Sequence, residues 1–307
     1  MSIISKNEPV AKSNAAEQRR TRIADYVELT KLRISVMVLI TFAAAAVLAS
    51  GGAVSGFVLF FSMLGMLCVA ASGNAMNMYI ERYSDFLMVR TQKRPLPDQR
   101  LSATKVATFG AVSFGIGFAI LLAAVNWQTA LLGIANWILY VLIYTPLKRK
   151  TPLNTEVGAI AGAIPILMGS LAATGSVGLI GWALFAHLVV WQFPHFMAIA
   201  WMYREDYARG GLQMLTVTDP TGRKAGRKAI WLSIVVLLVS LLPILTFRSS
   251  LHGVLFAIPA TLLGAWYIRA SIEFARELTR PAARKLLKVS VIYLPLYMLV
   301  VILASLT

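Results

Sequence analysis

One row of polar side chains closes the second apolar segment of this 307-residue chain. Asn77, Glu81 and Asp85 recur at every fourth position, and in an α-helix each such step turns a side chain by only about 40°. The three groups therefore share one helix face. Mg²⁺ prefers carboxylate and amide oxygens of this kind and bridges them to phosphate. The spacing alone favours an ordinary polar helix end that is salt-bridged to its own loop.

Cations follow this row in the next loop. Arg90, Lys93 and Arg94 are placed to bind phosphate oxygens that a metal ion leaves free. A second acidic pair, Glu205 and Asp206, closes the sixth apolar segment. Asp206 is the stronger candidate for a second metal site, and Glu205 is the weaker one.

The fourth apolar segment carries a polar stripe that begins with Asn136 and Tyr140. A stripe of this kind on a membrane helix should face the bundle interior, although hydrogen bonding between helices accounts for Asn136 as well. Tyr144, Lys148 and Arg149 follow at the polar edge. We expect these three side chains to bind a diphosphate.

His195 lies about eight residues, or roughly 12 Å, inside the sixth segment from its polar end. Ionisable side chains at such a depth are costly and are usually functional. His187, Trp191 and His195 share a face through the same spacing. A histidine that is hydrogen-bonded to a neighbouring helix is the alternative for His195 and the favoured interpretation for His187.

The composition defines the elements that must position these groups. Hydrophobic residues make up 58% of the chain, charged residues 14%, and the mean hydropathy is +0.71, whereas soluble domains carry about 25% charged residues. The net charge of +16 fits loops beside an anionic leaflet rather than nucleic acid. Each apolar run must be a helix to satisfy its backbone in lipid. The runs are about 35–54, 56–80, 104–124, 127–145, 156–174, 179–203, 228–248, 251–271 and 287–306.

The charge distribution predicts the topology of this all-α bundle of nine transmembrane helices. Of the 29 Lys and Arg residues only Arg248 falls on one side, and all 13 carboxylates fall on the other. The positive-inside rule then predicts a cytoplasmic N-terminus and an outside C-terminus. The two longest loops, about 81–103 and 204–227, both face the cytoplasm. They lie four spans apart, which predicts a weak internal duplication and an active site on the cytoplasmic side.

The N-terminal residues 1–24 are polar, mixed in charge and without an apolar core, which predicts a disordered cytoplasmic tail rather than a signal peptide. Their acidic residues are atypical of a mitochondrial transit peptide, which favours a bacterial inner membrane. Residues 25–307 are expected to form one transmembrane domain.

Four motifs resemble the UbiA superfamily of prenyltransferases. The row Asn77, Glu81 and Asp85 is similar to its N-x-x-x-D-x-x-x-D motif, with Glu81 in place of the first Asp. Three further strings are typical of its haem O synthase (protohaem IX farnesyltransferase) branch. They are R-T-x-x-R-P-L-P from Arg90, Y-T-P-L-K-R from Tyr144 and W-Q-x-P-H-F from Trp191. The chain departs from the pattern of that branch at two places. Tyr83 stands where the branch has an Asp, and no proline follows Met214-Leu215.

The resemblance implies a Mg²⁺-dependent transfer of farnesyl from farnesyl diphosphate to a vinyl group of haem B, with addition of water, to give haem O. It implies that Asn77, Glu81, Asp85, Glu205 and Asp206 hold Mg²⁺. Imidazole is a common ligand of haem iron, so His195 becomes a candidate haem contact. The lipid bilayer and a haem A synthase are the expected partners, and nucleic acid is not one. Prenylation of an aromatic quinone precursor is the alternative activity, and a transporter or a purely structural subunit are alternatives from other classes.

Overall fold

The computed structural model describes residues 22–247 and 249–306, in which every regular element is a helix. Most of the predicted tail 1–24, together with Arg248, lies outside these residues. The elements are α2 (Leu32–Ala49), α3 (Gly56–Leu87), α4 (Ala103–Ala124), α5 (Trp127–Ile138), η1 (Leu139–Tyr144), α6 (Thr145–Leu147), α7 (Asn154–Thr174), α8 (Leu179–Met202), α9 (Arg204–Arg209), α10 (Leu215–Thr218), α11 (Arg223–Ser240), η2 (Leu242–Thr246), α12 (Ser250–Glu277) and α13 (Arg280–Leu306).

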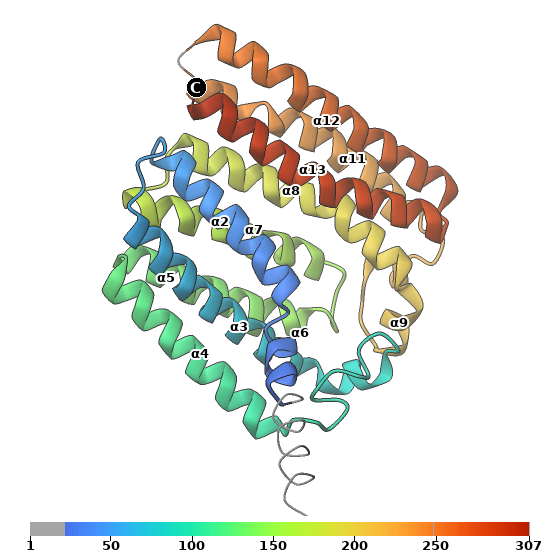
Figure 1. Cartoon of the computed structure of the whole chain (residues 1–307). Helices are drawn as coiled ribbons and strands as arrows, with labels where there is room; N and C mark the ends of the chain where they lie inside the picture. The colour runs from blue at the N-terminus through green and yellow to red at the C-terminus, as the bar shows by residue number, and fades with distance from the viewer. Residues whose placement is uncertain (1–21, 248, 307) are drawn as a thin grey trace, which may run out of the picture.

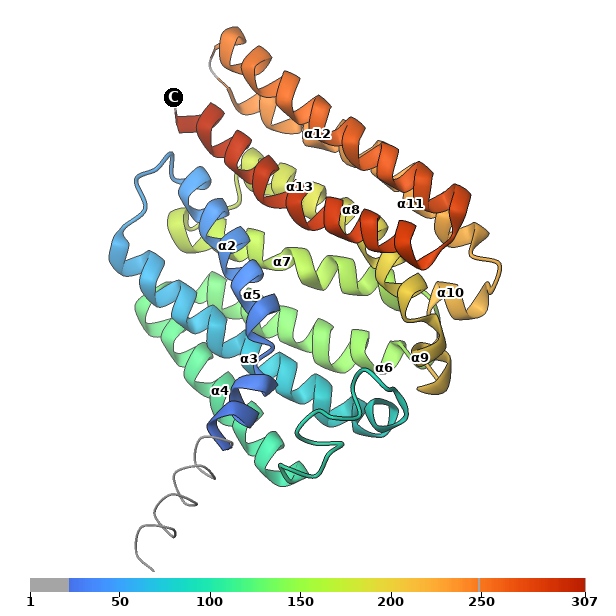
Figure 2. The same cartoon turned by 45° about the vertical axis from the view of Figure 1, so that its right-hand side comes forward.

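The prediction of nine spans is confirmed for this part of the chain. Nine helices, with their short extensions, are long and apolar enough to cross a membrane. They form a bundle in which α2, α7 and α8 lie between a group made of α3, α4 and α5 and a group made of α11, α12 and α13 (Figures 1 and 2). Helix α8 packs against α7, α11 and α13. The large buried core around α8 therefore fixes the helix that carries His195.

The second span is longer than its apolar run. Helix α3 continues to Leu87, because no Gly or Pro follows Ile80 within it and Glu81, Arg82 and Leu87 favour a helix. Asn77, Glu81 and Asp85 consequently lie on one continuous helix, as their spacing predicts.

The fourth span is not a uniform α-helix. Residues Leu139–Tyr144 form a π-helical segment, and such segments are frequent at functional sites. Thr145 Oγ1 donates a hydrogen bond of 2.8 Å to the carbonyl of Tyr140, which also accepts the backbone N–H of Thr145. The sequence did not indicate this segment, which carries both tyrosines of the stripe.

The two long loops meet at one end of the bundle, where α9 lies beside the loop that follows α3 (Figure 1). Met88 of the first loop packs with Tyr207 and Leu212 of the second. The backbone N–H of Val89 donates to Asp206 Oδ1 at 3.1 Å. The expectation that both loops lie on one side of the molecule agrees with this arrangement.

Candidate active site

The polar row on α3 is buried in the protein. The exposed fractions of Asn77, Glu81 and Asp85 are 1%, 7% and 0%. Buried carboxylates are stable only when paired or bound to a cation. The burial of the row differs from an ordinary polar helix end, although Asp85 does form a salt bridge to its own loop, through Arg94, as that alternative predicted.

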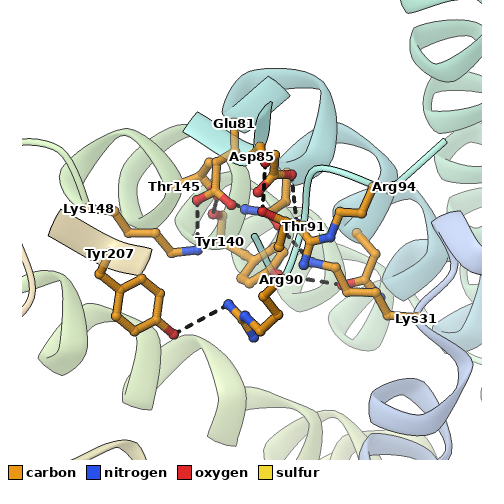
Figure 3. Close-up of polar contacts among 12 residues, drawn as sticks. Lys31, Glu81, Asp85, Arg90, Thr91, Arg94, Tyr140, Thr145, Lys148 and Tyr207 are labelled. Atoms are coloured by element: carbon orange, nitrogen blue, oxygen red, sulfur yellow. Dashed lines mark hydrogen bonds and ion pairs between the residues drawn. The ribbon is translucent and has the colours of Figure 1, made fainter. Parts of the chain in front are cut away.

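Each member of the row meets one cation from a different element. Lys31, which precedes α2, donates from Nζ to Asn77 Oδ1 at 2.7 Å. Lys148, which follows α6, lies with Nζ 2.7 Å from Glu81 Oε1. Arg94, in the loop after α3, donates from Nη1 to Asp85 Oδ2 at 2.7 Å. We call these six residues the α3 cluster; Figure 3 shows its charged members converging.

The charges of the cluster are strongly coupled. Burial on its own would lower the pKa of Lys148, but the neighbouring Glu81 carboxylate outweighs it, so the pKa of Lys148 lies above its ordinary value. Burial lowers the pKa of Lys31 to about 7, and the positive charges of Arg94 and Lys148 act in the same direction. The three cations thus repel one another in a space that favours an added anion.

Two threonines hold the row in place. Asn77 Nδ2 donates to Thr145 Oγ1 at 3.1 Å, which joins α3 to the end of the π-helical segment. Thr91 Oγ1 donates to the backbone carbonyl of Asp85 at 2.9 Å, which fixes the start of the following loop (Figure 3). Both contacts join residues that the sequence places in separate motifs.

The residues of the cluster fit a magnesium ion. Asp85 Oδ1 is buried and has no hydrogen-bond partner in the described part of the chain. That part contains no group of three or more His, Cys, Asp or Glu placed to hold a metal. Mg²⁺ needs no such cage, because it commonly takes one or two carboxylates, waters and the phosphates of its substrate.

An apolar cavity of about 490 Å³ adjoins the cluster, a size suited to a small-molecule site. Asn136, Tyr140 and Tyr144 all line it, which confirms that the polar stripe faces the bundle interior. Lys148 Nζ lies 4.5 Å from the centre of the Tyr144 ring. Tyr140 and Tyr144 therefore connect the polar cluster with the cavity.

Two glycines of α7 make room for the cavity wall. A Cβ at Gly158 would lie 2.6 Å from the Tyr144 ring, and one at Gly162 would lie 2.3 Å from Gln192 Oε1. Gln192 Nε2 donates to the carbonyl of Ala159 at 2.8 Å. The G-x-x-x-G pair thus positions two side chains that line the cavity.

The remaining predicted cations are more exposed. Arg90 lies over the Tyr203 ring, 4.6 Å from its centre, and donates to Tyr207 Oη at 3.5 Å, with its guanidinium on the side of Lys148 (Figure 3). Burial raises the pKa of Tyr207, so this phenol stays neutral while it accepts from Arg90. Lys93 and Arg149 are exposed, and their side chains have no ion pair within the described residues.

The second acidic pair lies in a different environment. Asp206 Oδ1 accepts from Val89 N at 3.1 Å and from Arg209 Nη2 at 2.6 Å. The side chain of Glu205 is 78% exposed and lies 3.4 Å from Arg204. The contacts of Asp206 connect two loops, and those of Glu205 stay within its own short helix.

The two histidines of α8, His195 and His187, also lie in different environments. His195 lines the cavity, and its Nδ1 lies 2.8 Å from Ser290 Oγ. His187 is fully buried and stacks on Tyr297 at a centroid distance of 3.8 Å. The favoured interpretation of His187, a histidine hydrogen-bonded to a neighbouring helix, is wrong, because neither ring nitrogen has a hydrogen-bond partner among the described residues. His187 packs through its ring face instead.

Lys31 and Thr145 were not among the predicted site residues. Lys31 stands at the start of the first apolar segment among other basic residues, where it looked like part of the positive-inside pattern. Its left-handed backbone, with φ of 47°, is the feature that places it beside α3. A sequence gives no direct signal for that conformation at a lysine.

Comparison with known families identifies the class. The UbiA prenyltransferase family model matches residues 38–294 of the chain. The chain belongs to the UbiA prenyltransferase family, and with its nine apolar helices it is a multi-pass membrane protein.

Particular relatives narrow this class. The chain is 40% identical to the protoheme IX farnesyltransferase of Solibacter usitatus, over 89% of this chain and 95% of that protein. It is 39% identical to the protoheme IX farnesyltransferase of Rhodopirellula baltica, over 91% and 99% respectively. Among solved structures, digeranylgeranylglyceryl phosphate synthase superimposes with a TM-score of 0.76 at 17% identity, over 93% of this chain and 99% of that one. A UbiA homologue from Archaeoglobus fulgidus gives a TM-score of 0.66 at 17% identity, over 90% and 99%.

Proposed function

We propose that this chain transfers a farnesyl group from farnesyl diphosphate to a vinyl group of haem B, with addition of water, to give haem O. The observation that carries the proposal is the α3 cluster adjoining an apolar cavity through Tyr140 and Tyr144. The cluster suits a diphosphate, and the cavity suits an apolar tail and a flat acceptor. Similarity to protoheme IX farnesyltransferases along nearly the whole chain supports this choice of substrates.

The cluster is arranged to stabilise a leaving diphosphate. When the bond between farnesyl C1 and the diphosphate oxygen breaks, the electron pair stays on the diphosphate. Lys148, Arg94 and Lys31 lie where that negative charge would develop, and preorganised cations of this kind stabilise it at little reorganisation cost. Arg90 would bind the outer phosphate oxygens, with Lys93 and Arg149 available at the rim.

The row on α3 would hold a magnesium ion through Asn77, Glu81 and Asp85, and the ion when bound would neutralise and polarise the diphosphate. The Archaeoglobus fulgidus UbiA homologue was solved bound to GPP and Mg²⁺, which supports this reading. Asp206 and Glu205 are weaker candidates for a second ion, because Asp206 Oδ1 already has two donors.

The apolar cavity would protect the farnesyl cation from water. The electron pair of a haem vinyl group then forms a carbon–carbon bond to farnesyl C1. Water adds to the new cation beside the porphyrin ring and loses a proton, which leaves a hydroxyethylfarnesyl substituent. His195, on the cavity wall, would contact the haem.

The proposal extends to the domain organisation, the membrane location and the fate of the product. Residues 25–307 act as one domain in a bacterial inner membrane, with the site facing the cytoplasm. The product then passes to a haem A synthase.

An acceptor assay tests the proposed function. Purified protein in detergent is incubated with Mg²⁺, farnesyl diphosphate and either haem B or an aromatic acid, and the products are separated by chromatography and mass. We expect haem O from haem B and no prenylated aromatic acid. Prenylation of the aromatic acid, with haem B unchanged, would contradict the acceptor assignment.

A further inference from the structure

The imidazole of His195 makes its hydrogen bond to Ser290, a residue of a neighbouring helix. Ser290 lies on α13, which packs against α8 in both views of the molecule (Figures 1 and 2). Its hydroxyl oxygen lies 2.8 Å from His195 Nδ1. Its backbone carbonyl accepts a 3.1 Å hydrogen bond from Trp191 Nε1. Ser290 therefore contacts two residues that stand one turn apart on α8.

Those two rings also support each other. The rings of Trp191 and His195 are nearly parallel, with centroids 5.0 Å apart and an interplanar angle of 25°. Tyr267 Oη donates to the carbonyl of Trp191 at 3.0 Å. The imidazole thus has one indole against its face and one hydroxyl at its edge, which restricts it to one orientation.

The hydrogen bonds of Ser290 determine which imidazole nitrogen carries the proton. Ser290 Oγ donates its single hydrogen to the carbonyl of Leu287 at 2.7 Å, so toward His195 it can only accept. The proton of the neutral imidazole must then lie on Nδ1. Nε2 is left with a free electron pair, and it has no hydrogen-bond partner within the described residues while His195 lines the cavity.

We propose that Ser290 is a positioning residue that keeps His195 in its Nδ1-protonated form, so that Nε2 serves as an axial ligand to the iron of the acceptor haem. This inference rests on the proposed function and deepens it. A histidine ligand commonly donates its second N–H to an oxygen acceptor, which fixes the ring and strengthens the ligating nitrogen. Ligation would hold the porphyrin in the cavity in one orientation and so present one vinyl edge to the farnesyl cation.

The experiment compares haem B bound to the full-length wild type, Ser290→Ala, His195→Ala and Ser233→Ala in detergent. Ser233 is the matched control, because it is fully buried and its hydroxyl donates to the carbonyl three residues earlier, as that of Ser290 does. Haem affinity is measured by absorption titration. The iron–histidine stretch of the ferrous complex is measured by resonance Raman spectroscopy.

We expect the wild type and Ser233→Ala to share one iron–histidine band. Ser290→Ala should shift that band to lower frequency and weaken haem binding by about 10-fold. His195→Ala should lose the band, and added imidazole should restore an axial ligand. A purely structural role of Ser290 would change affinity without moving the band.

Two results would overturn the inference. One is an unshifted band in Ser290→Ala, and the other is a persisting iron–histidine band in His195→Ala. If the wild type still makes haem O in either case, the proposed function stands and only the role of Ser290 and His195 fails. If the wild type makes no haem O and prenylates another acceptor, the proposed function itself fails.

Discussion

The two acidic helix ends of this molecule use similar residues in opposite ways. At the end of α3 the carboxylates of Glu81 and Asp85 are buried, and their partners are side-chain cations from other elements. Just beyond the end of α8, on the short helix α9, the carboxylate of Asp206 binds a backbone N–H of the other loop and an arginine of its own helix. Both ends carry acids followed by basic residues. The two ends differ in which groups donate hydrogen bonds to the carboxylates.

This comparison indicates which end can take a ligand. The side chains of Lys148 and Arg94 can leave Glu81 and Asp85 when a diphosphate and a cation bind together, because the ligands bring a partner for each charge. The bond from Val89 to Asp206 is part of the loop structure and cannot be exchanged without loosening it. We therefore infer that the α3 end binds substrate and that the α8 end mainly holds the loops together.

Removing the charge of Asp85 should have the largest effect. Asp85→Asn keeps the shape but loses the carboxylate whose Oδ1 has no partner among the described residues. We expect kcat for farnesyl transfer to fall by about 10³-fold, as for loss of a key electrostatic group. Activity within 10-fold of the wild type would contradict this role of Asp85.

Removing Lys148 should damage both activity and stability. Lys148→Met takes away a cation that faces the diphosphate and leaves Glu81 buried without it. We expect kcat to fall by about 10²-fold and stability to fall by about 3 kcal/mol. The double variant with Glu81→Gln should regain stability without regaining activity, as thermal unfolding and turnover would show.

The control for Lys148 is Lys285, which pairs with Glu273 at the protein surface. Its side chain is 56% exposed, against 12% for Lys148. Exposed pairs contribute little to stability, so Lys285→Met should unfold close to the wild-type temperature. Equal destabilisation by the two substitutions would show that burial does not distinguish the pairs.

A substitution at a glycine on α7 tests how far the cluster depends on its neighbours, with a smaller expected effect. Gly158→Ala places a methyl group 2.6 Å from the Tyr144 ring, which must move away from its place beneath Lys148. We expect turnover to fall by up to about 100-fold. The matched control is Gly115→Ala, because a Cβ there meets nothing within 4 Å and turnover should be unchanged.

A substitution in the second acidic end should change turnover least. Asp206→Asn keeps an oxygen for Val89 but loses the charge that binds Arg209. We expect turnover to fall by about 10-fold or less, because the effect reaches the site only through the loops. Hydrogen exchange at the Val89 amide should become faster. Slow exchange combined with a complete loss of turnover would favour a direct metal-binding role for Asp206.

Much of the fold was predictable because hydrophobic length and charge determine it. The nine spans and the row on α3 follow from local patterns that helix geometry converts directly into positions. The end of α3 at Leu87 was underestimated, because the hydropathy pattern ends before the helix does. The π-helical segment was missed because no residue type marks it.

The partners within the site were less predictable. Lys148 and Arg149 are adjacent in sequence, yet Lys148 meets Glu81 and Arg149 is exposed. Lys31 reaches Asn77 from 46 positions away, a contact that depends on how α2 lies against α3. Pairings of this kind arise from tertiary packing, which a single sequence does not encode in any local pattern.

The most direct test of the comparison is the affinity of farnesyl diphosphate measured with and without Mg²⁺ for the wild type, Asp85→Asn and Asp206→Asn. Our account predicts that Mg²⁺ strengthens binding by the wild type and by Asp206→Asn, and that this gain is lost in Asp85→Asn. The reverse pattern, with the gain lost in Asp206→Asn and retained in Asp85→Asn, would contradict the assignment of the diphosphate site to the α3 cluster.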